Sequence, residues 1–359
     1  MNLTDIAKMR LMSQQIAETK FKTAKDIVNW MGAMQAQDYI MAKWAVGVRL
    51  PNSTDQVIES AINNGEIIRT HLLRPTWHFV SADDIYWMLE LTAPQIKASL
   101  KSRHKELGLS ETIFAKSNTI IEKALRGGKH LIREELVNEL RKAKIATNDN
   151  RASHLMLRAE LDRIVCSGAT KGGKQTYALL EERVPKIKSL AKEEALAKLA
   201  RKYFASHGPA TLQDFVWWSG LSVRDAKHAL DMVKSDLSSE IIDSQTYWFT
   251  SFFSIPKTDK KAVYLLPSFD EFIISYKDRS ALLPFENQNK TVSNNGIFRP
   301  LIVVNGQVMG IWKRRIKKDK AIVEAKLFKQ PNKTTKGLII KASIEYGHFL
   351  QMKAGLSDC

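Results

Sequence analysis

The spacing of apolar positions divides the chain into three repeats of one pattern and a different C-terminal part. Each repeat has helical segments, with apolar residues every three or four positions, followed by runs with the alternation of strands. Three helices and a hairpin in this order are typical of a winged helix-turn-helix. The predicted segments are 3–19, 24–48, 55–63, 67–73 and 76–80, then 113–126, 132–142, 153–165 and 175–180, then 193–206, 211–219, 222–234 and 241–250.

After Pro256 the pattern changes to short strand-like runs, at 262–267, 298–304, 307–313, 321–327 and 337–344. Asn305-Gly306, between two of these runs, is a strong signal for a two-residue hairpin turn. The predicted fold class is therefore α+β, with three tandem winged helix-turn-helix units followed by a small C-terminal domain resembling a β-barrel. The predicted domains are 1–110, 111–188, 189–255 and 256–359.

Two glutamines, Gln35 and Gln37, lie within the apolar pattern of the first repeat. Apolar residues seven positions apart, from Ile27 to Val48, predict one amphipathic helix through both glutamines. Gln37 would then lie on the apolar stripe, where a buried amide is costly unless its hydrogen bonds are met. Gln35 would lie about 200° away around the helix, so both amides can face one site only if the helix ends or bends there. The local pattern alone favours a satisfied core glutamine beside an exposed one.

The charge of the chain favours a polyanionic partner. Lysine and arginine outnumber aspartate and glutamate by 55 to 38, which gives a net charge of +17. Double-stranded DNA is favoured over a membrane surface, although a generally basic protein need have no such partner. Hydrophobic and charged contents of 44% and 26% are those of an ordinary soluble protein, which we expect to be a monomer.

Basic side chains on the third helices and on two loops are the candidates for phosphate contacts. They are Arg151, His154, Arg158 and Arg224, with Lys171 and Lys174 in a glycine-containing wing, and Lys313, Arg314 and Arg315 in a run after a strand. Each has an ordinary alternative. Winged helices also bind proteins, the wing is equally typical of a solvated hairpin, and the basic run is typical of an edge that prevents strand aggregation.

Cysteine usage and the first residues indicate a cytoplasmic protein, which we expect to associate with the nucleoid. Cys166 and Cys359 cannot make a disulfide framework or a zinc site. The opening residues lack the apolar core of a secretory signal, and no apolar run approaches the length that crosses a bilayer. The motifs of serine hydrolases, P-loop proteins and zinc proteases are absent, and we expect no metal and no cofactor.

Two further segments are dense in polar residues. If residues 69–80 form a hairpin, Thr76 and His78 share one face of a strand, where they can point toward a site. A lone histidine on a strand is more often structural. The charges between Leu266 and Arg279 support, by themselves, only a buried network of ion pairs.

Taken in order, these segments resemble the AlkZ-like DNA glycosylases, a winged-helix family. The resemblance covers nearly the whole chain. The residues that carry it are Gln35-Ala36-Gln37-Asp38, Arg69-Thr70, 73–79, 207–211, Asp214-Phe215, 218–220, 265–270, 277–279 and 310–313.

The resemblance implies excision of alkylated purines, chiefly N7-modified guanine, from duplex DNA, with interstrand crosslinks as substrates of some members. The family's catalytic Gln-x-Gln motif falls on Gln35 and Gln37, where one branch has Asp in place of the second glutamine. Because N7 alkylation makes the base a cationic leaving group, two amides that orient a water molecule suffice. The motif has no lysine, so we expect a monofunctional enzyme without an imine intermediate.

Other residues are expected to assist. Arg74, Thr76 and His78 would support the site or the adjacent DNA, and Asp38 would add negative charge or only cap a helix. Two other functions fit the same pattern. A transcriptional regulator would bind one undamaged sequence selectively, whereas a protein-interaction scaffold would not bind DNA.

Overall fold

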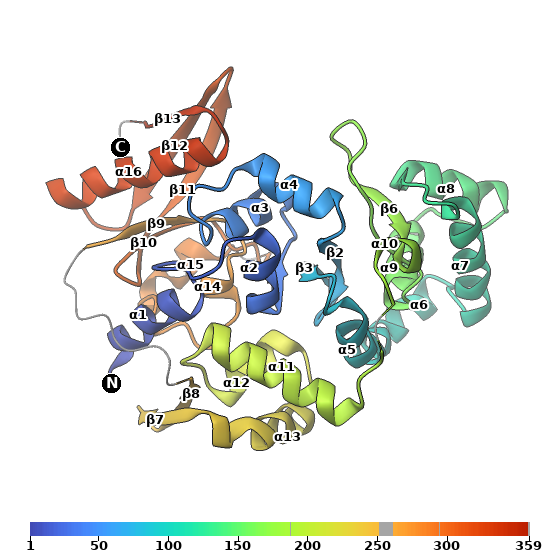
Figure 1. The fold of residues 1–359 in the computed structure, drawn as a ribbon, viewed down its shortest axis with the longest axis horizontal. Coiled ribbons are helices and arrows are strands. Elements are labelled where there is room, and N and C mark those ends of the chain that lie inside the picture. The colour runs from blue at the N-terminus through green and yellow to red at the C-terminus, as the bar shows by residue number, and fades with distance from the viewer. Residues whose placement is uncertain (187, 251–260, 294, 358–359) are drawn as a thin grey trace. The chain divides into compact units, whose positions relative to one another are not determined.

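The chain combines groups of helices with mostly antiparallel sheets, so the predicted α+β class is confirmed (Figure 1). The computed structural model describes residues 1–186, 188–250, 261–293 and 295–357. Contacts divide the chain into two compact units. The first comprises Met1–Glu59 and Leu196–Cys359, and the second comprises Ser60–Ala195. The assignment of three winged helices and of four domains stays a prediction, and its boundary at residue 255 lies outside the described residues.

The N-terminal elements are α1 (Leu3–Ser13), α2 (Ala24–Met31), β1 (Ala33–Gln35), α3 (Tyr39–Gly47) and α4 (Asp55–Asn63). Asn2 caps α1 and Thr23 caps α2, each through a side-chain oxygen that accepts a hydrogen bond from a first-turn amide. The apolar face of α3 is buried, and its Trp44 donates from Nε1 to the Leu265 carbonyl at 2.7 Å. Helix α3 is thereby fixed to the C-terminal part of the same unit.

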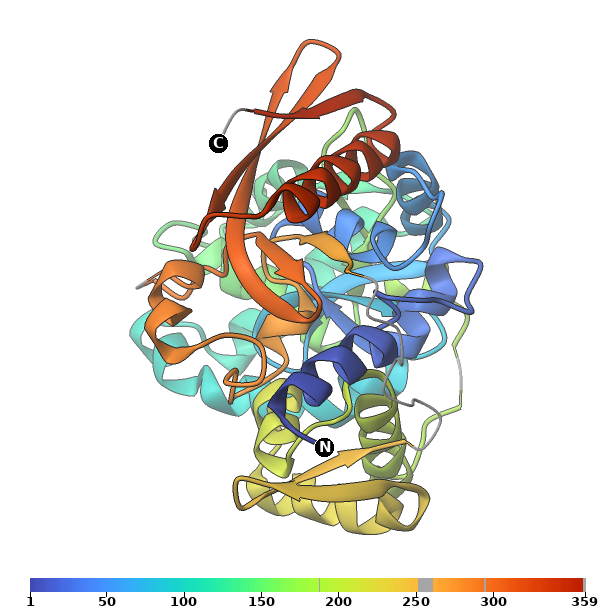
Figure 2. The same cartoon turned by 90° about the vertical axis from the view of Figure 1, so that its left-hand side faces the viewer.

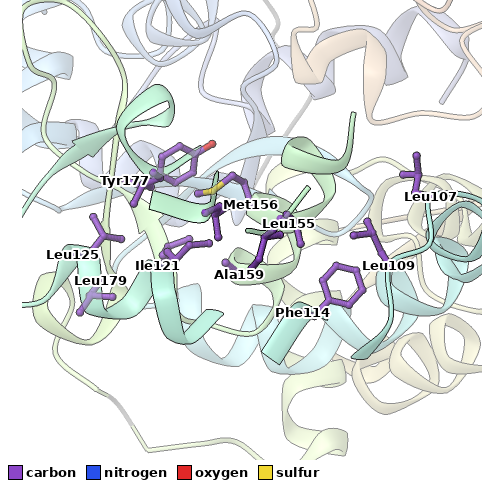
Figure 3. Close-up of a cluster of buried hydrophobic side chains, with 14 residues drawn as sticks. Leu107, Leu109, Phe114, Ile121, Leu125, Leu155, Met156, Ala159, Tyr177 and Leu179 are labelled. Carbon is purple, nitrogen blue, oxygen red and sulfur yellow. The ribbon is translucent and has the colours of Figure 1, made fainter. Parts of the chain in front are cut away.

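The described residues of the second unit form a two-stranded hairpin, a small sheet in the order β4-β6-β5 and six helices. Its elements are β2 (Ile67–Leu72), β3 (Thr76–Ser81), α5 (Ile85–Ser99), α6 (Lys101–Glu106), α7 (Glu111–Leu125), β4 (Leu131–Ile132), α8 (Arg133–Lys142), α9 (Arg151–Leu161), β5 (Val165–Ser167), β6 (Thr176–Leu179) and α10 (Leu180–Arg183). Strands β2 and β3 form the predicted antiparallel hairpin. Apolar side chains from α7, α8, α9 and β6 form one core (Figure 3).

The chain then returns to the first unit through α11 (Lys192–His207), α12 (Leu212–Ser219), α13 (Val223–Val233), the short turn η1 (Lys234–Asp236) and the hairpin of β7 (Ser238–Ile242) and β8 (Gln245–Phe249). The three predicted helices and the predicted strand region of the third repeat are therefore present. The C-terminal elements are β9 (Val263–Leu266), α14 (Glu271–Ile274), η2 (Phe285–Asn287), α15 (Gln288–Thr291), β10 (Leu301–Val304), β11 (Gln307–Lys317), β12 (Lys320–Leu327), α16 (Lys333–Phe349) and β13 (Lys353–Leu356).

Five C-terminal strands form one sheet, in the order β13-β12-β11-β10-β9. The sheet curls into a half-barrel, and α16 packs against β9 and β13 (Figure 2). The predicted turn at Asn305-Gly306 joins β10 to β11, and both residues have positive φ, 50° and 85°. Glycine is favoured at the second position because it adopts this conformation without strain.

One predicted strand is wrong. Residues 337–344 lie in helix α16, and the fifth strand of the sheet is β13. Asn332 caps the helix by accepting a hydrogen bond from Thr335 N at 2.8 Å. The buried positions of α16 recur at helical spacing: Ile339, Ala342, Ser343, Tyr346, Gly347 and Phe349. A short apolar run such as 338–340 fits a strand or a helix equally well, and here the helical spacing of the later positions decides.

No helix in the described part of the chain is long and apolar enough to cross a membrane. Cys166 is a buried free thiol whose pKa burial raises to about 12, which makes it unreactive. Cys359 lies outside the described residues.

Candidate active site

The two glutamines lie where one helix ends and another begins. Helix α2 ends at Met31 because Gly32 takes φ 75°, a conformation that favours glycine. The short strand β1 follows, and α3 begins after Asp38. The prediction of one helix through residues 24–48 is therefore wrong. The interruption that would let both amides serve one site is present.

The burial of the two glutamines is the reverse of what a continuous helix requires. Gln35 is 5% exposed, whereas Gln37 is exposed. The side-chain oxygen Oε1 of Gln35 accepts a hydrogen bond from the backbone N of Gln37 at 2.9 Å. This contact folds the loop back on itself and fixes the backbone of Gln37 beside the side chain of Gln35.

Asp38 caps α3. Its Oδ1 accepts from Met41 N at 3.2 Å, and its Oδ2 accepts from the Ser268 hydroxyl at 3.2 Å. Both carboxylate oxygens are thus engaged by protein donors, and the cap on α3 is what one of the two sequence interpretations of this residue expects. A negative charge at the first turn of a helix is favourable, so Asp38 helps to fix the point at which α3 begins.

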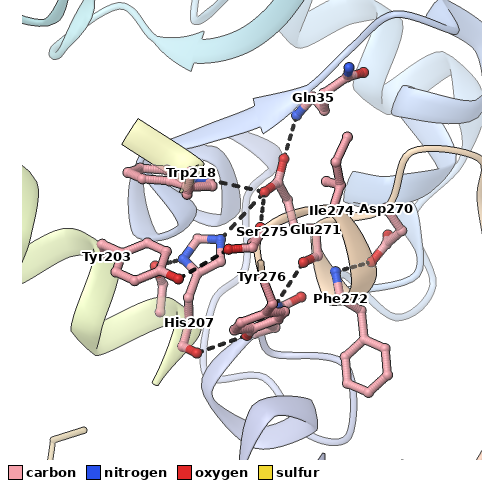
Figure 4. Close-up of polar contacts among 12 residues, drawn as sticks. Gln35, Tyr203, His207, Trp218, Asp270, Glu271, Phe272, Ile274, Ser275 and Tyr276 are labelled. Atoms are coloured by element: carbon pink, nitrogen blue, oxygen red, sulfur yellow. Dashed lines mark hydrogen bonds and ion pairs between the residues drawn. The ribbon is translucent and has the colours of Figure 1, made fainter. Parts of the chain in front are cut away.

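A buried carboxylate anchors the loop of residues 35–38, which carries both glutamines and is called the glutamine loop below (Figure 4). Glu271, at the start of α14, is 2% exposed, and its Oε1 accepts from the backbone N of Gln35 at 2.6 Å. Its Oε2 accepts from Trp218 Nε1 at 3.2 Å and from the Ser275 hydroxyl, and lies 3.5 Å from His207 Nε2. Figure 4 shows the amide end of the Gln35 side chain directed away from Glu271.

The environment of Glu271 decides its charge. Burial raises the pKa of the carboxyl, but His207, Ser275 and the Gln35 amide stabilise the anion and together lower the pKa to about 2. Burial lowers the pKa of His207 from its usual value, so the imidazole is neutral at pH 7. Its Nδ1 lies 2.8 Å from the Ser206 hydroxyl. An ionised carboxylate is therefore hydrogen-bonded directly to the backbone amide of Gln35.

The residue before Glu271 fixes this segment to the core. Asp270 forms a bidentate ion pair with Arg49, at 2.8 Å for each bond, and both side chains are fully buried. Arg49 also donates from Nε to the Gln14 carbonyl at 3.0 Å and from Nη2 to Gln14 Oε1 at 2.8 Å. Asp270 Oδ1 accepts from Phe272 N at 2.9 Å, which caps α14. The buried ion-pair network predicted for this stretch is confirmed.

The other supporting candidates lie in the second unit, on the β2–β3 hairpin. Arg74 is half-buried in its turn, after Leu73, which has φ 56°. Thr76 is half-buried and His78 is 1% exposed. The His78 ring places Nδ1 2.9 Å from the Thr76 carbonyl. Thr76 and His78 thus contact each other on one strand.

The candidate DNA-contacting residues differ in how freely their side chains project. Arg158 is held by Glu111 at 2.9 and 2.5 Å and by Asp162 at 2.8 and 3.0 Å. Arg151 donates to the carbonyls of Ala146 and Leu107, and the His154 ring contacts that of His104. The more exposed candidates are Lys171, Lys174, Arg224, Lys313 and Arg315, whereas Arg314 is half-buried.

The sequence predicts no site role for His207, Trp218 or Glu271. Only the stretches around them were singled out, and no local pattern indicates that Glu271 reaches Gln35 across 236 positions. In the described part of the chain, no group of three or more His, Cys, Asp or Glu side chains is placed to hold a metal ion.

The buried histidine predicts how stability depends on pH. Because the pKa of His207 is lowered in the folded state, only the unfolded chain binds a proton just below the usual value of 6.5. The free energy of unfolding should therefore fall as pH decreases from about 7 to 5, by at most about 1.4 kcal/mol per pH unit for this group. Glu271, with its pKa of about 2, stays ionised throughout this range.

Urea unfolding at both pH values, for wild type and His207→Gln, measures this effect. The variant should lose less stability on acidification, because the other histidines contribute equally to both proteins. An equal loss in wild type and variant would contradict the assignment of a neutral, buried His207.

Comparison with known proteins gives a consistent result. Residues 28–343 match the family model described as "DNA glycosylase AlkZ-like". An "Interstrand DNA cross-link repair glycosylase" of Streptomyces sahachiroi is 22% identical over 363 residues, covering 96% of this chain and 95% of that protein. The solved structure of Streptomyces sahachiroi DNA glycosylase AlkZ superposes with a TM-score of 0.82 at 17% identity, covering 99% of this chain and 100% of the other.

Proposed function

Because the chain belongs to the AlkZ-like family of DNA glycosylases, we propose that it hydrolyses the N-glycosidic bond of alkylated purines in duplex DNA. N7-alkylguanine is the first substrate to test. Interstrand crosslinks are the second, because the Streptomyces sahachiroi relative is described as a crosslink repair glycosylase. The observation that carries the proposal is the glutamine loop, held between a buried carboxylate and a helix start.

In the proposed reaction, the bond between C1′ of the sugar and the base nitrogen breaks, and the electron pair leaves with the base. This pair neutralises the positive charge that alkylation placed on the purine. A water molecule then bonds to C1′ and loses a proton to solvent. Gln35 and Gln37 orient this water, because each amide can donate and accept hydrogen bonds. Holding the water in line is worth several orders of magnitude in rate when the leaving group is already good.

Glu271 contributes in two ways without contacting the substrate. Its carboxylate fixes the backbone of Gln35, and its buried negative charge favours the positive charge that develops on the sugar. Because no lysine lies in the loop, the enzyme is proposed to be monofunctional, leaving an intact abasic site. Asp38 positions α3, and Arg74, Thr76 and His78 are proposed to support the DNA or the site.

The partner is double-stranded DNA, bound chiefly through its phosphates and without sequence preference. Lys171, Lys174, Arg224, Lys313 and Arg315 are the proposed phosphate contacts, because their side chains are exposed. Arg151, His154, Arg158 and Arg314 are weaker candidates, since all four side chains are half-buried and contact other residues of the protein.

The proposal is tested by incubating the purified protein with methylated duplex DNA and measuring free 7-methylguanine. Release of the base, with an abasic strand that borohydride does not trap on the protein, is the expected result. A trapped protein–DNA adduct would contradict the monofunctional mechanism. No release from methylated or crosslinked duplex would contradict the enzyme function itself. A selective footprint on undamaged DNA would instead favour a regulator.

Glu271→Gln tests the anchoring role. The amide matches the carboxylate in size but turns one acceptor oxygen into a donor, which then faces the N–H of Gln35 or of Trp218. We expect the single-turnover rate of base release to fall about 10- to 100-fold, because the loop shifts relative to the sugar. DNA affinity should stay unchanged. Glu286→Gln, at an exposed position of the same unit, is the matched control, and equal rates for the two variants would contradict the role.

A further inference from the structure

The second unit contains a cavity that the proposed excision chemistry does not use. It has a volume of about 250 Å³. Strands β2 and β3 contribute His71 and Trp77, helix α9 contributes His154 and Glu160, and β6 contributes Tyr177. Arg133, at the start of α8, also lines it and is exposed. All of these residues belong to the same compact unit.

A buried carboxylate with one unused oxygen lies in the wall of this cavity. Glu160 is 0% exposed. Its Oε2 accepts from the Thr70 hydroxyl at 3.1 Å and from His71 N at 2.8 Å, and lies 2.9 Å from His71 Nδ1. Its Oε1 is also buried, and within the described residues no donor bonds to it. A buried, unpaired carboxylate oxygen is costly, so this position favours a ligand that brings an N–H donor and positive charge.

The other walls of the cavity suit a planar ring. Tyr177 is 9% exposed, and burial raises the pKa of its phenol, which therefore stays neutral. The His71 and Trp77 rings lie together, with centroids 4.0 Å apart. His154 Nδ1 is a second buried polar atom that lacks a partner among the described residues. Cations bind favourably beside aromatic rings, and since a cavity of about 150 Å³ already holds benzene, this one can hold a two-ring base.

We propose that the cavity binds an N7-alkylated guanine, whose ring has N–H donors on one edge and, while a sugar is attached at N9, a positive charge. Glu160 Oε1 accepts a hydrogen bond from that edge, and Tyr177 packs against the ring. The choice of an alkylated purine among planar cations rests on the proposed glycosylase function. Two sources carry this donor edge: a whole nucleotide, whose ring keeps its positive charge, and the released base, whose ring is neutral after the bond to the sugar breaks. Arg133, which is exposed, would meet the phosphate only of the nucleotide.

Titration calorimetry with the intact protein, in slightly acidic buffer, tests the proposal. The probes are 7-methylguanosine 5′-monophosphate and guanosine 5′-monophosphate, which differ by the methyl group and its charge. We expect the methylated nucleotide to bind at least tenfold more tightly, and Glu160→Gln to abolish this preference. Equal affinities for wild type, a preference that survives in Glu160→Gln, or no binding at millimolar concentration would each overturn it.

Two variants keep the result interpretable if Glu160→Gln fails to fold. Ser153 lines the cavity and is exposed on α9, so Ser153→Trp should block entry and abolish binding without touching Glu160. If nucleotides are the natural ligand, Arg133→Ala should weaken the binding of the nucleotide but not that of free 7-methylguanine. If the released base is the natural ligand, Arg133→Ala should weaken the binding of neither. Unchanged binding by Ser153→Trp would place the ligand elsewhere and overturn the proposal.

Binding and excision can fail separately. Gln35→Ala should lose base release and keep nucleotide binding, since Gln35 lies in the first unit. Base release by wild type without nucleotide binding would overturn only the proposal that the cavity binds alkylated guanine. Nucleotide binding without base release from any alkylated duplex would overturn the proposed excision function but not the proposed ligand site in the cavity.

Discussion

Asp270→Ala should lower the free energy of unfolding of the first unit by about 3–5 kcal/mol, because it leaves a buried guanidinium without its counter-ion. Arg49 and Asp270 are both fully buried and joined by two bonds of 2.8 Å. The remaining acceptors of Arg49, on Gln14 and Ala45, are uncharged. They can satisfy hydrogen bonds but cannot neutralise the positive charge.

Urea unfolding of wild type and variant measures this effect. Glu286→Ala, at an exposed site in the same unit, should change stability by less than about 0.5 kcal/mol and serves as the control. Asp270→Asn should be less damaging than Asp270→Ala, because the amide oxygen still accepts one bond from Arg49. A loss below about 1 kcal/mol for Asp270→Ala would show that the pair does not hold this segment.

The same substitution should also affect the glutamine loop. Asp270 precedes Glu271 and caps α14, and Glu271 binds the backbone of Gln35. At a temperature where Asp270→Ala is still folded, its base release should therefore be slower than that of wild type. Stability and activity are thus linked through one short helix.

Gln37→Ala should reduce the single-turnover rate of base release by about 100- to 1000-fold, which corresponds to about 2.7–4 kcal/mol of transition-state stabilisation. Gln37 is exposed, so its removal should leave the fold unchanged. Gln35→Ala should have an effect at least as large, because Gln35 also accepts a hydrogen bond from the backbone of Gln37. Both variants should bind DNA as wild type does, because neither glutamine carries charge.

Gln37→Asp is the informative companion variant. The resemblance implies that one branch of the family has aspartate at this position, and an aspartate oxygen can still accept a hydrogen bond from water. This variant should be faster than Gln37→Ala. An Asp variant as slow as the Ala variant would mean that the donor of the amide, rather than its acceptor, matters.

Local signals in the sequence predicted much of the fold. Asn305-Gly306 specifies its turn through the backbone angles of two residues, and α4 (Asp55–Asn63) has the predicted bounds. No element is predicted for the residues of helix α5 (Ile85–Ser99), which contains Pro94. The apolar run in residues 337–344 predicts a strand where the structure has helix α16, because a short apolar run fits either structure.

The sequence pattern does not predict the break between α2 and α3, for a different reason. Apolar residues seven positions apart, from Ile27 to Val48, continue in register on both sides of it. The signals were present, since Gly32 ends one helix and Asp38 caps the next. A single glycine costs a helix only about 1 kcal/mol, so the periodicity outweighed it.

The candidate site was only partly predictable. Gln35 and Gln37 belong to a motif of four consecutive residues, so a local sequence pattern predicts them. Glu271 and Arg49 were not, because their partners are 236 and 221 positions away. Such pairs form only when distant parts of the chain pack together, so no local pattern in the sequence predicts them.

The double variant Gln35→Ala/Gln37→Ala tests the central claim most directly, through its single-turnover release of 7-methylguanine from methylated duplex. If both amides hold the same water, their effects are not additive. The double variant should then be about as slow as the slower single variant, with unchanged DNA binding. Release by the double variant at the wild-type rate would contradict the claim that these two glutamines position the hydrolytic water.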